Sequence, residues 1–133
     1  EVVSEAKTLQ IQHKTRFIAT DMFQSPLPEN TELFSLIRVL HDHDDEPVKH
    51  LLARLYDALR PGGHLLIAEP MAGTAGAAPI GDTYFSFYLW AMGSGRPRTA
   101  EELQAMCLAA GFTRVREFKT PIPALTRLLV AEK

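Results

Sequence analysis

The stretch that decides the fold runs from Leu36 to Asp45 and reads Leu-Ile-Arg-Val-Leu-His-Asp-His-Asp-Asp. It is an apolar run that ends abruptly on an imidazole, that of His41, and on a cluster of carboxylates. Apolar runs of this length predict buried parallel strands, and ligands of open α/β sheets bind just beyond the carboxyl ends of such strands. We therefore expect His41 to lie at a functional crevice.

Two further apolar runs end on an ionisable side chain in the same way. Residues 65–68 precede Glu69, and residues 16–20 precede Asp21. If all three runs are strands of one sheet, their ends bring an imidazole and two carboxylates to a common crevice.

A helix is predicted between the strand that ends at His41 and the strand at residues 64–69. Apolar residues recur at helical spacing from Val48 to Leu59, with Asp44 or Asp45 as the N-cap. The turn Pro61-Gly62-Gly63 is predicted to end it, and because this turn follows a helix it is not a phosphate-binding loop. The strand–helix–strand order predicts parallel neighbouring strands, so His41 and Glu69 should share one edge of the sheet.

Residues 2–10 have the apolar spacing of a helix, and residues 70–81 have the composition of a loop over the crevice. Residues 84–92 hold five of the aromatic side chains and are apolar on all sides, which predicts a buried helix. This helix either lines a pocket for a large apolar substrate, through Tyr88 and Met92, or serves as core or as an oligomer interface.

The last third of the chain is predicted to form a helix and two strands. Thr99 and Glu102 make a capping box for a helix that closes at Gly111. Residues 115–120 and 125–132 have strand character and are expected to pair antiparallel.

The bulk composition favours one domain or part of one. The chain has 133 residues, 46% of them hydrophobic, and its formal charge of −2 with 14 scattered basic residues argues against a nucleic-acid partner. Cys107, the single cysteine, is expected to be a small core residue. No transmembrane segment or signal peptide is recognised, which predicts a cytoplasmic protein.

His41 and Glu69 together suit general-base chemistry. A carboxylate beside an imidazole fixes the orientation of the ring and favours its protonated form, and such a dyad removes a proton from a hydroxyl or an amine. The alternative is that His41 is an ordinary residue at a strand end, hydrogen-bonded to the backbone.

The neighbouring acidic residues have both structural and functional interpretations. Asp44 and Asp45 are explained as caps of the following helix, while Asp42, nearest the strand end, is the candidate for contact with substrate. The His-x-His-x-Asp spacing from His41 also resembles the start of a metallo-hydrolase site. The further ligands of such a site are missing, since only His50 and His64 follow, so no metal is predicted.

Several short motifs resemble the small-molecule O-methyltransferase family that includes caffeate and acetylserotonin methyltransferases. The order and spacing of these motifs fit along the whole chain. They are Asp21-Met22-Phe23, Leu40-His41-Asp42, Leu59-Arg60-Pro61-Gly62-Gly63, Ala68-Glu69-Pro70, Arg98-Thr99 and Ala110-Gly111-Phe112. Within the family, the segment from Gly95 to Thr99 most resembles the bacterial carotenoid enzymes that methylate hydroxyneurosporene or demethylspheroidene.

The resemblance implies an enzyme that uses S-adenosylmethionine and has a Rossmann-like α/β fold. His41 matches the catalytic base of the family, and Glu69 matches one of the two glutamates that flank it. Asp21 and Met22 match residues that hold the adenine of the cofactor. The implied substrate is a hydrophobic hydroxylated small molecule, and the implied full-length protein is a homodimer.

The chain departs from the family pattern in several respects. Pro97 stands where the family has its second flanking glutamate. The Gly-rich cofactor loop, the acid that binds the ribose and the amino-terminal dimerisation domain have no counterpart, so residues 1–133 resemble the carboxyl-terminal part of one catalytic domain. We expect this part alone to be inactive; either it belongs to a longer enzyme or it folds with the first strand displaced. The alternative from another class is a noncatalytic binding module with the same fold.

Overall fold

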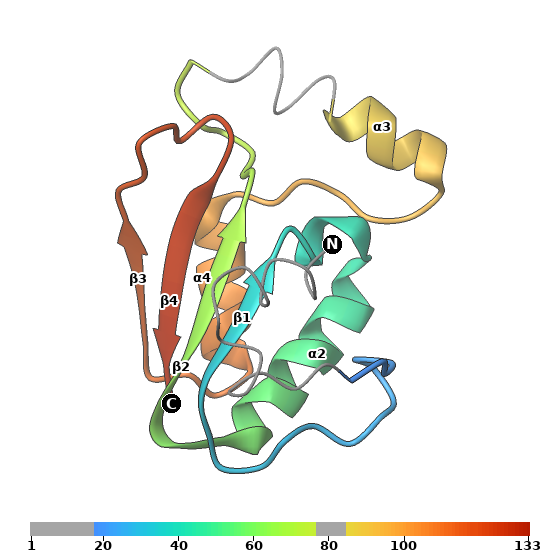
Figure 1. Cartoon of the computed structure of the whole chain (residues 1–133). Coiled ribbons are helices and arrows are strands. Elements are labelled where there is room, and N and C mark those ends of the chain that lie inside the picture. The colour runs from blue at the N-terminus through green and yellow to red at the C-terminus, as the bar shows by residue number, and fades with distance from the viewer. Residues whose placement is uncertain (1–17, 77–84) are drawn as a thin grey trace, which may run out of the picture.

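The described residues form a four-stranded sheet with the order β1-β2-β4-β3 (Figure 1). The computed structural model describes residues 18–76 and 85–133. The elements in chain order are β1 (Thr31–Ile37), the short 3-10 helix η2 (Leu40–Asp42), α2 (Asp45–Ala58), β2 (Leu59–Glu69), α3 (Phe85–Met92), α4 (Ala100–Ala109), β3 (Arg114–Phe118) and β4 (Arg127–Glu132).

The predicted parallel strand pair is confirmed. β1 and β2 lie side by side and parallel, with Leu36 opposite Ile67, and α2 forms the connection between them. Because the apolar residues of α2 recur on one face of the helix, that face is buried against the sheet. Its buried residues are Val48, Leu51, Leu52 and Leu55.

The start of α2 agrees with the sequence, and its end does not. Asp44, one of the two predicted candidates, is the N-cap residue, although its side chain makes no cap hydrogen bond; the helix stops at Ala58 and the chain passes directly into β2. β2 therefore begins at Leu59 instead of His64. The Pro-Gly-Gly turn lies within an irregular start of this strand, where the register against β1 shifts and Gly62 takes a φ of 72° that few other residues tolerate.

β1 ends earlier than the sequence predicted. The expected strand continues to Leu40, but β1 stops at Ile37, four residues before His41. Arg38 has a φ of 55°, which turns the chain out of the sheet, and η2 then carries His41. The strand ends here because the N–H groups of Val39 and Leu40 bind the Glu69 carboxylate instead of a neighbouring strand.

The expected strand at residues 16–20 is not formed in the part of it that the structure describes. Ile18, Ala19 and Thr20 are in irregular structure and exposed, and they pair with none of the four described strands. Residues 16 and 17 lie outside the described residues, as does the predicted helix at 2–10.

Only one face of the sheet is covered by described helices. α2 packs on β2, α4 packs on β3 and β4, and the two helices contact each other. The core between them includes Leu65 and Ile67 of β2 and Leu129 of β4. The opposite face carries Leu33, Ile37 and Phe118, which are exposed. The prediction that the strand before His41 is buried is therefore wrong for the described chain, because nothing described covers this second face.

α3 is a helix, as predicted, but it is not buried. The side chains of Phe87 and Met92 are exposed and Trp90 is 81% exposed, while Leu89 is buried. In Figure 1 this helix stands apart from the sheet, beyond the amino-terminal end of α2. A helix that is apolar on all sides was expected to have neighbours on all sides, and the described residues provide them for one side alone.

The carboxyl-terminal third agrees with the sequence. α4 begins with a capping box in which the Thr99 hydroxyl accepts the Glu102 N–H and the Glu102 carboxylate accepts the Thr99 N–H. β3 and β4 pair antiparallel. Cys107 is a buried core residue on α4, and burial raises the pKa of its thiol to about 12, so it stays protonated and unreactive at neutral pH.

The capping box predicts a measurable loss of stability when its hydroxyl is removed. Thr99→Ala leaves the N–H of Glu102 without its acceptor, and should lower the free energy of unfolding by about 1 kcal/mol in urea denaturation. Thr99→Ser keeps the oxygen and should retain most of the stability. Equal losses in the two variants would assign the effect to packing of the methyl group instead.

Candidate active site

His41 and Glu69 meet at the edge of the sheet where β1 and β2 end. His41 is 4% exposed and Glu69 is 2% exposed. The imidazole Nδ1 lies 3.6 Å from Oε2 of the glutamate. The structure thus brings together the two residues that the sequence placed on adjacent strands, although His41 lies on η2 beyond the strand itself.

The Glu69 carboxylate is held by the backbone of the turn before His41. Its Oε1 accepts the N–H of Val39 at 2.9 Å and also accepts the N–H of Leu40. Hydrogen bonds from backbone N–H groups to an ionised carboxylate are strong, and they satisfy one oxygen of a group that is otherwise costly to bury. The second oxygen, Oε2, faces His41.

Asp42 lies on the other side of the imidazole. Its Oδ1 is 3.3 Å from Nε2 of His41, and its side chain is 50% exposed. The ring therefore lies between a buried carboxylate at Nδ1 and a half-exposed carboxylate at Nε2. Each ring nitrogen thus has a carboxylate beside it, and the two carboxylates together restrict the orientation of the ring.

A cluster of two arginines and one carboxylate supports this turn, and sequence reasoning missed it. Asp45, at the start of α2, accepts hydrogen bonds from Arg96 at 3.1 Å and from Arg98 at 2.7 Å. These bonds, that from Arg96 first, hold the pKa of Asp45 at about 2, below its ordinary value of 3.8. The available signal was Arg96 and Arg98, with a single residue between them, ahead of the cap at Thr99, together with the three acidic residues 44–46 at the start of α2.

The predicted cofactor residues lie on a turn beside the same edge. The Asp21 carboxylate accepts the N–H of Phe23 at 2.8 Å, and the Phe23 ring packs edge-on against His43, with ring centres 4.8 Å apart. Met22 is half-buried against the core, and its carbonyl accepts a hydrogen bond from Arg54 of α2. The turn is thereby connected to the residues that follow His41.

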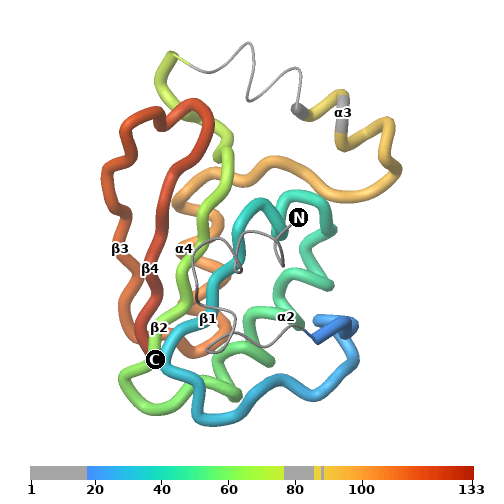
Figure 2. Tube along the Cα trace, in the orientation of Figure 1, coloured from blue at the N-terminus to red at the C-terminus, as the bar shows by residue number. Residues whose placement is uncertain are grey.

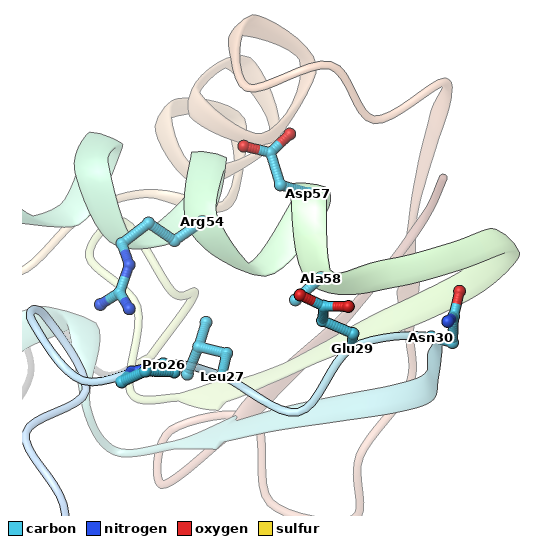
Figure 3. Close-up of a pocket in the computed structure, with 7 residues that line it drawn as sticks. All are labelled: Pro26, Leu27, Glu29, Asn30, Arg54, Asp57 and Ala58. Carbon is cyan, nitrogen blue, oxygen red and sulfur yellow. The ribbon is translucent and has the colours of Figure 1, made fainter.

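A separate open pocket of about 380 Å³ lies between α2 and the chain that leads into β1 (Figure 3). It holds none of the predicted site residues. Figure 3 shows that the Arg54 side chain extends toward Pro26 and that Asp57 points away from the pocket centre. The lining residues are Pro26, Leu27, Glu29, Asn30, Arg54, Asp57 and Ala58.

The predicted substrate residues differ in where the structure places them. Asp42 is beside His41, and Met92 is exposed at the end of α3. The side chain of Tyr88 lies outside the described residues. After α3 the chain comes back to the turn that carries His41. There the Ser94 hydroxyl donates to the carbonyl of Asp42 at 3.1 Å.

The His-x-His-x-Asp residues do not converge as metal ligands. His43 packs against Phe23, and Asp45 is bound by arginines. In residues 18–76 and 85–133, no three His, Cys, Asp or Glu side chains are grouped so that they could hold a metal ion. None of the described helices is long and apolar enough to cross a bilayer.

Comparison with known proteins identifies the family. A family model described as an O-methyltransferase domain matches residues 1–113. The chain belongs to this family. It is 42% identical over 120 residues to demethylspheroidene O-methyltransferase of Rhodobacter capsulatus, an alignment that covers 90% of this chain and 30% of that protein. The chain thus spans less than a third of the length of this relative.

Solved structures confirm the expected fold class, a partial Rossmann-like methyltransferase fold. Human N-acetylserotonin methyltransferase in complex with SAM matches with a TM-score of 0.76 and 27% identity, over 94% of this chain and 37% of that one. An O-methyltransferase family 2 protein from Planctomyces limnophilus, in complex with apigenin, matches with a TM-score of 0.86 and 26% identity, over 98% of this chain and 39% of that one.

The ion pairs of Asp45 predict an acid-dependent loss of stability. Because its folded-state pKa is lowered to about 2, the stabilisation is complete above about pH 4 and is lost as the pH falls toward 2. Asp45→Asn should lower the free energy of unfolding at pH 7 by about 1–2 kcal/mol, less than for a fully buried pair since Asp45 is 38% exposed.

The measurement is urea unfolding of both proteins between pH 7 and pH 3, with the difference shrinking below about pH 4. Asp57→Asn, at an exposed position of α2, is the matched control and should change little. A difference between wild type and Asp45→Asn that is constant over this range would contradict the assignment to the charge.

Proposed function

We propose that the full-length protein containing this chain transfers a methyl group from S-adenosylmethionine to a hydroxyl of a hydrophobic small molecule, with His41 as the general base. The observation that carries this proposal is the placement of a nearly buried imidazole between Glu69 and Asp42 within an O-methyltransferase domain. The chain's family makes methyl transfer the reaction class, and the imidazole supplies the group that takes the hydroxyl proton.

The geometry assigns different roles to the two ring nitrogens of His41. The Glu69 carboxylate lies 3.6 Å from Nδ1, which favours a proton on that nitrogen, so Nε2 is the nitrogen that would act as the base. During methyl transfer Nε2 would take the hydroxyl proton, and the carboxylates of Glu69 and Asp42 beside the ring would face the imidazolium that forms. An aliphatic alcohol is a weak acid, so correct placement of the hydroxyl contributes much of the rate.

The acceptor reaches the imidazole from the side of Asp42. His41 is nearly buried, whereas Asp42 is half exposed and borders Nε2, so a substrate hydroxyl that approaches Nε2 also meets the Asp42 carboxylate. Tyr88 and Met92 of α3 are proposed to contact the apolar body of the substrate. The relative that acts on demethylspheroidene supports a hydroxylated carotenoid as the substrate class.

Asp21 and Met22 suit an adenine by their chemistry. An exposed carboxylate accepts from an exocyclic amino group, and a half-buried thioether provides an apolar surface for an aromatic ring. When bound, S-adenosylmethionine supplies a methyl group on a positively charged sulfur. The complex of human N-acetylserotonin methyltransferase with SAM supports this choice of donor.

We also propose that residues 1–133 form the carboxyl-terminal part of one catalytic domain, and that the loop gripping the ribose and methionine ends belongs to chain outside these residues. The proposed place of action is the cytoplasm, consistent with a single buried thiol.

Replacing the base tests the proposed function in the full-length protein. His41→Ala should lower kcat for methyl transfer by about 10²–10⁴-fold while S-adenosylmethionine binding, measured by calorimetry, stays within about threefold. His50→Ala removes an exposed imidazole from α2 and should leave both quantities unchanged. Retained turnover in His41→Ala would rule out the base assignment.

The exposed aromatic face of α3 favours a second candidate, a noncatalytic module that uses this helix as a contact surface, including contact within a homodimer. Phe87 and Trp90 present a large apolar area to solvent in the described chain. Trp90→Ser should weaken self-association of the full-length protein by at least tenfold in analytical ultracentrifugation. A monomeric wild-type protein with full methyl transfer would eliminate this candidate.

A further inference from the structure

The guanidinium of Arg98 is buried directly against the turn that carries His41. Arg98 is 3% exposed. One terminal nitrogen donates to the carbonyl of Leu40 at 2.9 Å, and the other donates to the carbonyl of His43 at 2.8 Å. These two carbonyls bracket His41 and Asp42 in the sequence, so a single side chain fixes the backbone on both sides of the imidazole.

The opposite side of the same turn is fixed by Glu69. Its carboxylate accepts the N–H groups of Val39 and Leu40, while Arg98 donates to carbonyl groups of the turn. An anion therefore holds the donors of the turn and a cation holds its acceptors. Arg98 comes from the segment between α3 and α4, more than fifty residues after the turn.

The segment that leads to Arg98 also lies in close contact with the turn. Figures 1 and 2 show it running from α3 past the start of α2 to α4. The N–H of Gly95 donates to the Asp44 carboxylate at 2.9 Å. Gly95 has a φ of 85°, and a Cβ at this position would overlap the carbonyl oxygen of His41. Only a glycine allows the two segments to approach this closely.

The arrangement is better suited to fixing a geometry than to adding stability. Burial of a cation costs much of what its ion pair returns, and the partner Asp45 is shared with Arg96. The planar fork of a guanidinium can bind two separate carbonyls and a carboxylate at once, whereas the ammonium of a lysine is a point charge without this geometry.

We propose that Arg98 is a positioning residue for His41: through the carbonyls of Leu40 and His43 it sets the place of the imidazole relative to the acceptor hydroxyl. This inference rests on the proposed function of His41 as a base. Arg98 itself touches no reacting atom, so its effect should appear in the rate of the chemical step and not in the binding of either substrate.

The test compares Arg98→Lys with wild type in the full-length protein. Because small misplacements of a catalytic group cost up to about 10²-fold in rate, kcat should fall about 10–100-fold while both KM values stay within about twofold. Arg114→Lys, which alters an ion pair with Glu132 at the far end of β4, is the matched control and should keep the wild-type kcat. A wild-type kcat in folded Arg98→Lys would overturn the proposal.

Two further measurements test the role of Arg98. Gly95→Ala displaces the His41 carbonyl without removing any charge, and it should reproduce the fall in kcat if Arg98→Lys does not fold. The ring ¹⁵N resonances of His41, assigned by their loss in His41→Ala, should shift in Arg98→Lys and stay unchanged in Arg114→Lys. A wild-type protein without methyl transfer would refute the proposed function. The ring resonances would then still show whether Arg98 positions His41. Resonances of His41 that are unchanged in Arg98→Lys would refute the positioning role.

Discussion

The burial of the Glu69 carboxylate is the constraint on which the site depends. A charged group that is 2% exposed needs hydrogen-bond donors, and those it finds are the backbone N–H groups of Val39 and Leu40. This requirement ends β1 at Ile37, because the same N–H groups cannot also serve a neighbouring strand. It also directs the chain into η2, which places His41 against the second oxygen of the carboxylate. The end of β1, the turn η2 and the position of His41 are thus all explained by the buried carboxylate of Glu69.

The site draws on three separate parts of the chain, each held by a charged group. β2 supplies Glu69, the turn before α2 supplies His41, and the segment before α4 supplies Arg98. The contacts between them join a carboxylate to N–H groups and a guanidinium to carbonyl groups, so each charge is matched to the opposite end of the peptide dipole. The position of the imidazole therefore depends on all three segments at the carboxyl ends of β1 and β2, and not on the residues next to His41 alone.

Features with local causes were predictable from the sequence. The helical spacing of α2, the capping box at Thr99 and the parallel pairing across the β1–α2–β2 unit all follow from residues close together in the chain. The early end of β1 was missed, since an apolar residue such as Leu40 gives no sign that its N–H will bind a distant carboxylate. The exposure of α3 was missed because an apolar helix does not reveal what covers it. Arg98 was noticed only as part of a motif, and its contacts were missed because its partners Leu40 and His43 lie more than fifty residues away.

The strand order has a consequence for how the chain assembles. β4 lies between β2 and β3, although β3 comes first in the sequence. β2 therefore keeps one unsatisfied backbone edge until the β3–β4 hairpin has formed and docked, bringing Leu129 and Ala131 into the core. Contacts between such distant segments form slowly, and an unpaired strand edge is a template for intermolecular pairing in the meantime. The segment after β3 therefore completes the interior of the sheet: until residues 127–132 are in place, β2 lacks its antiparallel neighbour.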